Sequence, residues 1–390
     1  MFERSAQAIP DGCSSRPHCR AIHGPIARKG SRQLTLELRV ERFGEEHIAP
    51  YVRLSRAEYG DHVAVAQESH LRWKFMENPQ GPSVGIHLYK GEQLVGRLVA
   101  MPRDFLYRGR TYKAAYMADL VVEREHRGML PLLQLMQGMK QLSGFDFIAV
   151  TPNPAGAEVW EKFARMPAHF DLAVAALPLR PARVADTSGK LKIGRLAPLV
   201  DWPVNALIGW GGGLGSLFAH GELETRWPDA NELDSLFAAA AGEDQATGRR
   251  DAAFLEWRFR RSPVFRYSTM FLRDRGKLAG YVVTRRSEYG GYECNFVVDA
   301  FARPDLTAGL WREIRFNTIR ESAKEGVEIA MAIGNLRCGA LAKLAHFPFL
   351  AIPARYLPRV MKLYAQWLTA PDFSFQPEAF ILSLGDCDIV

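Results

Sequence analysis

Residues 71–79 read L-R-W-K-F-M-E-N-P, and residues 255–263 read L-E-W-R-F-R-R-S-P, 184 positions later. Both copies carry tryptophan at the third place, and Lys74 in the first copy is matched by Arg258 in the second. Trp73 and Trp257 stand among apolar residues at helical spacing, so we expect both to be core anchors. Further matching segments follow in the same order: 91–100 with 275–284, 118–122 with 298–302, and 147–153 with 329–335. Matching pairs in one order predict a duplicated domain.

Both copies have the same expected order of elements. Helices come first, then a meander of three strands, a helix, one more strand and another helix. The expected meander strands are 84–90, 93–101 and 112–122 in the first copy, and 266–273, 278–286 and 291–299 in the second. We therefore predict an α/β (α+β) chain of two tandem domains, each with a mixed, mostly antiparallel central sheet flanked by helices. The predicted parts are a disordered tail (1–33), a first domain (34–178), a linker (179–199) and a second domain (200–390).

Composition excludes several classes of protein. The 390 residues suit two domains, and 47% of them are apolar. No apolar run approaches the roughly 18 residues of a membrane span. The net charge of +7 is concentrated in residues 1–33, which does not suggest a nucleic-acid groove on a folded face. Five cysteines without a C-x-x-C pair indicate a reducing compartment, so we expect a cytoplasmic protein. Cys13, His18, Cys19 and His23 crowd together, but their spacing matches no common zinc pattern, and we expect no metal site.

The segment 118–136 suggests the chemistry. It reads A-D-L-V-V-E-R-E-H-R-G-M-L-P-L-L-Q-L-M, an apolar strand that turns through Arg127 and Gly128 into an apolar helix. Such a turn directs backbone N–H groups and a helix N-terminus at one point, which favours binding of an anion. Arg127 adds a guanidinium suited to phosphate.

With these segments in this order, the sequence resembles the GNAT superfamily of acyl-CoA-dependent N-acyltransferases, in a tandem arrangement that covers 34–178 and 200–390. The coenzyme A motif of that superfamily, V-x-P-x-[YH]-R-G-x-G-[ILV]-[GA], is matched by Val122, His126, Arg127 and Gly128. Its later motif, N-x-x-A-x-x-x-Y, falls on 153–160. The resemblance implies acetyl-CoA as acyl donor and a small-molecule or peptide amine as acceptor. From the charge distribution and the apolar runs we expect no nucleic-acid or membrane partner, and the oligomeric state stays open.

The resemblance also implies roles for individual residues. Strand 118–122 would offer backbone hydrogen bonds to the pantetheine arm, and the turn after it would bind the pyrophosphate. The expected coenzyme-binding residues are Leu120, Val121, Val122, Arg127, Gly128, Met129, Leu130, Asn153 and Trp160. Asp119 is a candidate general base, directly or through water; it could equally cap a turn or pair with an arginine. Tyr116, on the same strand, is a candidate acid or a core residue.

The first copy departs from the motifs at several places. The second glycine of the coenzyme A motif is missing, Arg124 stands where proline is usual, and Pro131 removes one N–H donor from the first helical turn. Trp160 replaces the usual tyrosine, and an indole cannot supply the proton that a departing thiolate needs. The second copy has no R-G-x-G at all, so acyl-CoA binding is assigned to the first copy. Two alternatives stay open: a catalytically degenerate GNAT-like binding or scaffold protein, and a Fem-like aminoacyl transferase.

Overall fold

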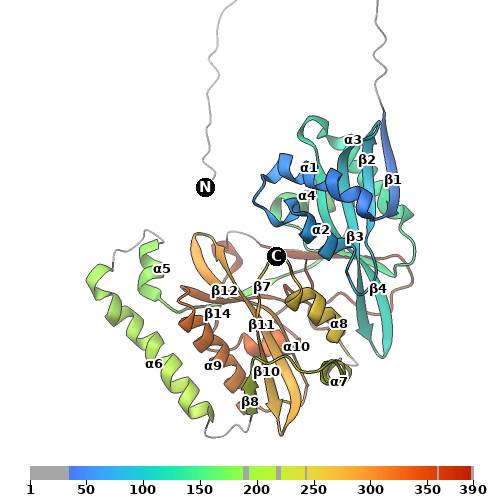
Figure 1. The fold of residues 1–390 in the computed structure, drawn as a ribbon. Coiled ribbons are helices and arrows are strands. Elements are labelled where there is room, and N and C mark those ends of the chain that lie inside the picture. Colours follow the sequence, from blue (N-terminus) through green and yellow to red (C-terminus); the bar gives the residue numbers. More distant parts are fainter. Residues whose placement is uncertain (1–34, 188–192, 217–220, 242–243, 358–359, 388–390) are drawn as a thin grey trace, which may run out of the picture. The chain divides into compact units, whose positions relative to one another are not determined.

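The computed structural model describes residues 35–187, 193–216, 221–241, 244–357 and 360–387. The expected tail at 1–33 and the Cys/His cluster within it lie outside the described residues. From Leu36 onward the chain forms one compact unit. It contains two mixed sheets, one for each copy of the repeat (Figure 1). Among the described residues, no helix is both long and apolar enough to cross a membrane.

The first sheet is built around the predicted meander of the first copy. Its strand order is β1-β2-β3-β4-β5-β15-β6, with β9 paired to β3 and β16 paired to β9. Neighbours are antiparallel except β4 with β5 and β9 with β16. The strands are β1 (Leu36–Arg42), β2 (Val84–Lys90), β3 (Gln93–Tyr107), β4 (Arg110–Val122), β5 (Phe147–Val150), β6 (Ala168–Asp171), β9 (Ala246–Gly248), β15 (Lys362–Trp367) and β16 (Phe380–Ile381).

The second sheet repeats this plan. Its strand order is β14-β7-β13-β12-β11-β10-β8, and β12 with β13 is its parallel pair, in the place of β4 with β5. The strands are β7 (Ala173–Pro178), β8 (Gly221–Glu224), β10 (Ser268–Asp274), β11 (Lys277–Tyr289), β12 (Tyr292–Ala302), β13 (Ile329–Gly334) and β14 (Leu350–Ala351). The predicted fold class, two tandem mixed sheets that are mostly antiparallel, is confirmed.

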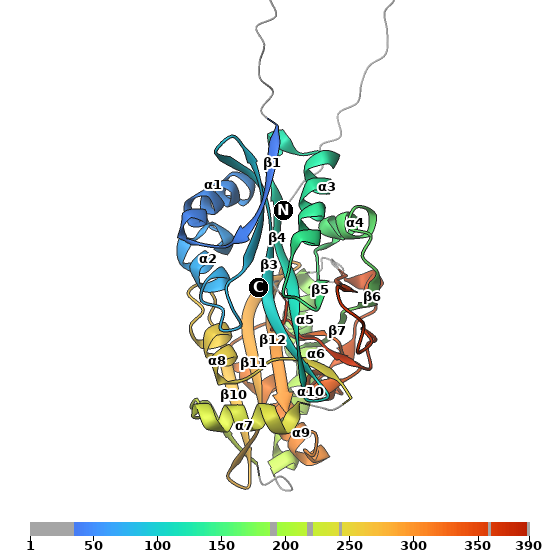
Figure 2. The same ribbon diagram turned by 90° about the vertical axis from the view of Figure 1, so that its right-hand side faces the viewer.

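Helices cover the sheets on both faces. Figure 2 shows α1 and α2 on one face of the first sheet and α3 and α4 on the other. In the second copy, α9 and α10 pack on one face of the sheet, and α7 and α8 pack toward the core that both copies share. The helices are α1 (Ile48–Tyr59), α2 (Glu68–Phe75), α3 (Met129–Gly138), α4 (Pro154–Lys162), α5 (Pro181–Thr187), α6 (Ala197–Ser216), α7 (Ala230–Ala240), α8 (Ala252–Leu255), α9 (Ala308–Lys324) and α10 (Gly339–Leu344). The shorter helical turns are η1 (Glu45–His47), η2 (Ala64–Ala66), η3 (Arg124–His126), η4 (Met139–Gln141), η5 (Gly194–Leu196), η6 (Glu256–Arg260) and η7 (Ala354–Tyr356).

The two copies exchange one strand each. Strand β7 follows the first copy along the chain, yet it pairs antiparallel with β13 of the second sheet. Reciprocally, β15 from the C-terminal part pairs antiparallel with β5 of the first sheet. The expected boundary after residue 178 therefore falls at the end of a strand that belongs to the second sheet. The division into domains at 34–178 and 200–390 stays a prediction.

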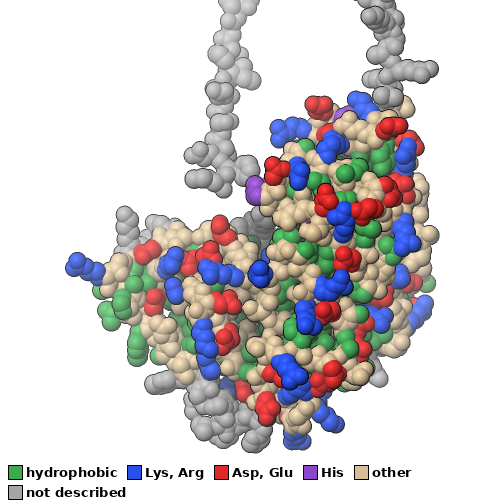
Figure 3. Space-filling model, viewed as in Figure 1, with side chains coloured by type: hydrophobic (Ala, Val, Ile, Leu, Met, Phe, Trp, Pro, Cys, Tyr) green, Lys and Arg blue, Asp and Glu red, His purple; other side chains and the backbone are tan. Residues whose placement is uncertain are grey.

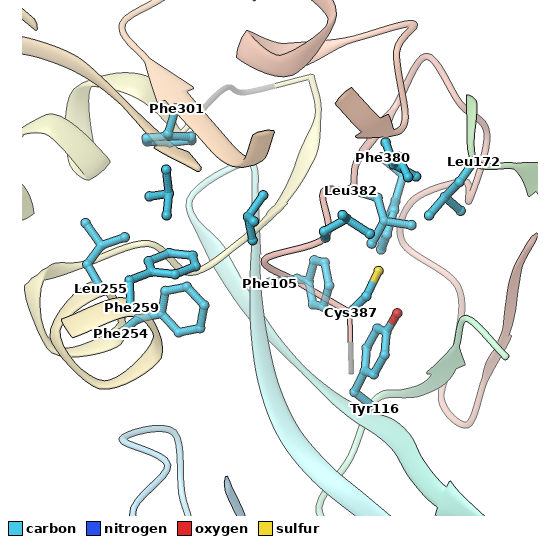
Figure 4. Close-up of a cluster of buried hydrophobic side chains, with 14 of the residues drawn as sticks. Phe105, Tyr116, Leu172, Phe254, Leu255, Phe259, Phe301, Phe380, Leu382 and Cys387 are labelled. Atoms are coloured by element: carbon cyan, nitrogen blue, oxygen red, sulfur yellow. The ribbon is translucent and has the colours of Figure 1, made fainter. Parts of the chain in front are cut away.

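One hydrophobic cluster joins the two sheets. It contains side chains from both copies and from the C-terminal segment, among them Trp73, Trp257 and Phe105. Figure 4 shows Phe254, Leu255 and Phe259 on one side of this cluster and Phe380, Leu382 and Cys387 on the other. Trp73 and Trp257 are 2% and 5% exposed, which confirms the prediction that they are core anchors.

Candidate functional site

The first sheet opens between β4 and β5. The parallel pairing of these strands covers only Ala114 to Tyr116 on β4. Beyond Tyr116, β4 continues to Val122, whereas β5 ends at Val150 and the chain turns into α4. A register shift between β3 and β4 lies opposite this point, after Arg97. The β5-facing edge of β4 beyond Tyr116 therefore offers backbone groups to an extended ligand, as an open strand edge does.

The opening leads to the N-terminus of α3. Gly128 precedes this helix in an extended conformation, and a Cβ atom added there would meet only Pro131 Cδ, at 4.0 Å. The first turn of a helix has N–H groups without intrahelical partners, which makes it an anion site. Met129 and Leu130 are 67% and 65% exposed, an unusual position for large apolar side chains. The start of α3 thus combines open space beside the backbone, N–H donors and an exposed apolar pair.

Arg127 lies at the junction of β4 and α3. Its Nε donates to the carbonyl of Val122 at 3.1 Å, and its guanidinium forms an ion pair with Glu58 of α1. The side chain is 46% exposed. A phosphate at the start of α3 would compete with Glu58 for this guanidinium.

Asp119 stands in the irregular part of β4. Its backbone has φ of 51°, the left-handed region that few non-glycine residues adopt. The carboxylate accepts from Lys74 Nζ at 2.9 Å and from Arg97 Nη2 at 3.3 Å. Burial raises the pKa of Asp119, but Lys74 and Arg97 lower it, and the net shift is downward. Asp119 therefore pairs with an arginine, one of the alternatives that the sequence left open. Its role as a base stays a prediction.

Tyr116 lies where β4 and β5 separate. Its hydroxyl is 2.7 Å from Thr151 Oγ1, and Figure 4 shows it directed toward Cys387 of the C-terminal segment. Burial raises the pKa of Tyr116 well above its ordinary value, and burial raises the pKa of Cys387 to about 11. Both groups are therefore protonated at neutral pH. Tyr116 belongs to the shared core, and its hydroxyl is also able to donate a proton, so its candidate role as an acid stays a prediction.

The remaining expected ligands belong to β4 and α4. Asn153 caps α4, because its side chain accepts from the Gly156 N–H at 2.8 Å. Trp160 is 2% exposed, in the cluster between the first sheet and its helices that also contains Met117 of β4 and Val150 of β5. Val121 and Val122 are buried and Leu120 is half-buried, so these three would meet a ligand through their backbone. The expected contact of Trp160 with coenzyme stays a prediction.

The equivalent opening in the second sheet is occupied by the chain's own C-terminal segment, residues 380–387. The Gly385 N–H donates to the carbonyl of Val298 on β12 at 2.8 Å, and Gly334 of β13 pairs with Ser383. The Asn335 N–H donates to the carbonyl of Leu382 at 2.8 Å. The segment thus takes the place between β12 and β13 that is open between β4 and β5. The sequence did not predict this insertion, because residues 380–387 carry no motif that indicates where they pack.

Asp299, the repeat equivalent of Asp119, anchors that segment. Its carboxylate accepts from the Tyr281 hydroxyl at 2.8 Å and from Ser383 Oγ at 2.7 Å, and it pairs with Arg250 at 3.1 Å. Arg250 in turn pairs with Asp386 at 2.5 Å. Both aspartates therefore bind cations within the core, the first toward α2 and the second toward the C-terminal segment.

Glu41, His47 and His87 form a cluster whose ligand atoms lie within 4.8 Å of one another. Glu41 Oε1 is 3.2 Å from His47 Nε2 and 2.9 Å from His87 Nδ1. The other nitrogen of each ring is also engaged, since the Gly44 N–H donates to His47 Nδ1 and the Tyr51 hydroxyl is 2.7 Å from His87 Nε2. The Gly44 N–H requires a lone pair on His47 Nδ1, which puts the proton of a neutral ring on Nε2, facing Glu41. The cluster is thus a hydrogen-bonded brace between β1, α1 and β2.

Charged side chains of both signs are mixed on the surface. Figure 3 shows Lys and Arg interspersed with Asp and Glu over the face that it displays. Many are paired, as in Arg72 with Glu45 and Arg261 with Glu77. Such pairing leaves less unpaired charge to attract a polyanion.

No protein-family model and no curated protein matches this sequence. Solved structures resemble it. A probable N-acyltransferase from Enterococcus faecalis V583 is 13% identical, with a TM-score of 0.54, over 85% of this chain and 73% of that chain. A GCN5-related N-acetyltransferase from Anabaena variabilis is 12% identical, with a TM-score of 0.55, over 85% and 72%. N-myristoyltransferase from Saccharomyces cerevisiae, solved with bound myristoyl-CoA, is 11% identical, with a TM-score of 0.53, over 90% and 85%. The chain therefore has the GCN5-related fold in tandem, as its sequence predicted.

Proposed function

We propose that this protein is an acyl-CoA-dependent N-acyltransferase with a single coenzyme site, in the first copy. The asymmetry between the two openings carries this proposal: the one between β4 and β5 is open, and the one between β12 and β13 is filled by residues 380–387. The pantetheine amides would pair with the backbone of β4 beyond Tyr116, as an added strand does. The pyrophosphate would accept from N–H groups at the start of α3 and from Arg127.

We propose acetyl-CoA as the donor and a direct attack mechanism. The amine attacks the thioester carbonyl, the N–C bond forms, the C–S bond breaks, and the thiolate takes a proton. Tyr116, which is protonated at neutral pH, is the proposed donor of that proton. Asp119 is ionised, as a base must be, but its carboxylate already accepts from Lys74 and Arg97. Water is therefore the proposed immediate acceptor of the amine proton, and proximity of the bound reactants supplies most of the acceleration.

A binding or scaffold protein is the second candidate. Pro131 favours it, because the first turn of α3 lacks one N–H donor, and so does Trp160, because an indole cannot supply the proton that a departing thiolate needs. A Fem-like aminoacyl transferase has less support, because the surface charges described above are largely paired. We further propose a cytoplasmic location, in keeping with the free thiols of Cys294, Cys338 and Cys387.

Calorimetric titration with acetyl-CoA and myristoyl-CoA, followed by a free-thiol release assay on a panel of amines, tests the proposal. Binding with one equivalent of acyl-CoA, together with amine-dependent release of coenzyme A, is the expected result. Binding without thiol release on any amine would favour the scaffold. Absence of binding at about millimolar acyl-CoA, a free energy weaker than about −4 kcal/mol, would overturn the coenzyme site itself.

A further inference from the structure

A largely apolar cavity, partly open to solvent, lies between the cap of α4 and the second sheet. Its volume is about 190 Å³. Its walls come from β11, β12, β13 and the C-terminal part of the chain, and most of their exposed area is apolar. The lining residues are Asn153, Arg285, Ser287, Glu288, Tyr289, Phe296, Val298, Ile333, Met361 and Leu384. An apolar cavity of about 150 Å³ takes a benzene ring, so this one suits a compact body of slightly larger size.

Arg285 is the cationic residue of the cavity lining, and its charge is not balanced by the described residues. Two of its nitrogens, Nε and Nη1, are buried without a hydrogen-bond partner. The ring of Phe265 lies 4.6 Å from the guanidinium carbon, and the hydroxyl of Tyr267 is a neutral neighbour that brings no counter-charge. By contrast, the next residue, Arg286, is exposed and pairs with Glu293 at 2.9 Å. Partial burial of a guanidinium without a counter-charge lowers the stability of the fold unless a ligand supplies that charge.

Neighbouring groups do not supply that charge. Arg258 lies near Arg285, and its guanidinium donates to the carbonyls of Gly385 and Cys387. Glu288 also lines the cavity, but its side chain is exposed, and no ion pair joins it to Arg285 among the described residues. The cavity therefore combines apolar walls with a guanidinium that has no carboxylate partner among the described residues.

A carboxylate fits this combination. It is planar and carries one negative charge, and its two oxygens match the donors of one guanidinium. A phosphate would bring a second charge and a further oxygen into apolar walls, where one guanidinium cannot neutralise both.

We propose that this cavity binds the carboxylate and the apolar body of the acyl acceptor, so that the amine substrate is a compact apolar amino acid or the C-terminal residue of a peptide. The identification of this ligand as the acyl acceptor rests on the proposed function, whereas the carboxylate site itself is argued from the cavity and Arg285. Asn153 links the two regions, since it lines the cavity and caps α4 directly after β5, beside the opening that would hold the thioester.

The first experiment measures binding without coenzyme. The full chain is titrated with 3-phenylpropanoate and with 3-phenylpropanamide, which differ only in charge at the polar end. We expect the carboxylate to bind at least about tenfold more tightly, a difference of roughly 1.4 kcal/mol. Arg285→Gln should abolish this preference and Arg286→Gln should keep it, with melting temperatures checking that both variants fold. Equal binding of the two probes, no binding up to about 10 mM, or equal losses in both variants would overturn the carboxylate site.

The second experiment identifies which reactant carries the carboxylate. With acetyl-CoA as donor, L-phenylalanine is compared with 2-phenylethylamine as acceptor, and succinyl-CoA is compared with acetyl-CoA on the same amine. We expect Arg285→Gln to raise KM for phenylalanine at least about tenfold and to leave KM for phenylethylamine unchanged. If the variant instead impaired only succinyl-CoA, the acceptor assignment would be wrong. If carboxylate binding were selective but no amine were acylated, the carboxylate site would stand and the proposed enzyme activity would fail.

Discussion

Trp73 and Trp257 hold each other across the two copies of the repeat. Their rings stack with centroids 5.2 Å apart at an angle of 26°. The indole N–H of Trp73 donates to the carbonyl of Trp257 at 2.7 Å, and the indole N–H of Trp257 donates to the carbonyl of Trp73 at 2.8 Å. Equivalent residues of a duplicated segment thus meet at a local two-fold arrangement. The repeat that identified the fold is also its central contact.

We predict that Trp73→Phe and Trp257→Phe each lower the free energy of unfolding by about 1–3 kcal/mol, because each leaves a buried carbonyl of the partner without its donor. The two changes should be non-additive by at least about 0.5 kcal/mol, since the stacked rings are in contact. Urea denaturation of the single and double variants measures both quantities. Trp202→Phe is the control, because Trp202 is 67% exposed. Strictly additive effects would show that the two rings are energetically independent.

Asp119→Asn should destabilise the fold more than it impairs chemistry. The change removes the carboxylate charge beside the buried Lys74 and Arg97, and breaking a buried ion pair reduces stability by about 3–5 kcal/mol. Asp372→Asn is the control, since Asp372 forms an exposed pair with Arg110 that should contribute at most about 1 kcal/mol. Urea denaturation and the pH profile of kcat/KM check this prediction. Unchanged stability with a fall of about 100-fold in kcat/KM and loss of the acidic limb would make Asp119 the base.

Stability should fall as pH decreases from 6.5, in part because of His70. Burial, and then the Lys74 cation, lower the pKa of His70 to about 3. Since the folded pKa lies below the unfolded value of about 6.5, the unfolded chain binds this proton first, and stability is lost progressively between pH 6.5 and that folded pKa. At pH 5 the loss should be about 2 kcal/mol. His70→Gln should reduce the slope of unfolding free energy against pH between 7.5 and 5, whereas His62→Gln at an exposed position should not. Identical slopes in all three proteins would refute the assignment.

Arg127→Glu should weaken acyl-CoA binding at least about tenfold, or 1.4 kcal/mol, because it replaces attraction for the pyrophosphate by repulsion. Glu58→Gln should strengthen binding, because it removes the carboxylate that competes for Arg127. Calorimetry of the two variants measures both effects. The matched control is Arg303→Glu at the corresponding turn of the second copy, where Arg303 pairs with Asp274 and Asp305. Loss of binding in the Arg303 variant alone would show that the coenzyme site lies in the second copy and not in the first.

A chain that ends at residue 178 should not fold by itself. It lacks β15, which pairs with β5, and its own β7 belongs to the other sheet. Circular dichroism and size-exclusion chromatography should show an unfolded or aggregated product. Deletion of residues 1–33 is the control and should leave the melting temperature within about 5 °C. Cooperative unfolding of the 34–178 fragment would support the domain boundary that the sequence suggested.

The sequence by itself determined the repeated elements of the two copies and their order. Each copy of the repeat carries the periodicities of its own helices and strands, and periodicity reports which face of an element is buried. It also indicated the turn at Arg127 and Gly128, because strand, basic residue, glycine and helix follow one another within a few positions. The match of Lys74 with Arg258 signalled a position that needs a cation, but its partner was not readable.

Only the tertiary structure decided how the two copies share their parts. The exchange of β7 and β15, the ion pairs of Asp119 and the filling of the second opening by residues 380–387 all join segments that are distant along the chain. Local patterns do not record such contacts, because a strand shows the same alternation whichever sheet receives it. An aspartate likewise looks the same in sequence whether it meets a substrate or a buried arginine. The neighbours that fold against Asp119 decided that its carboxylate is paired.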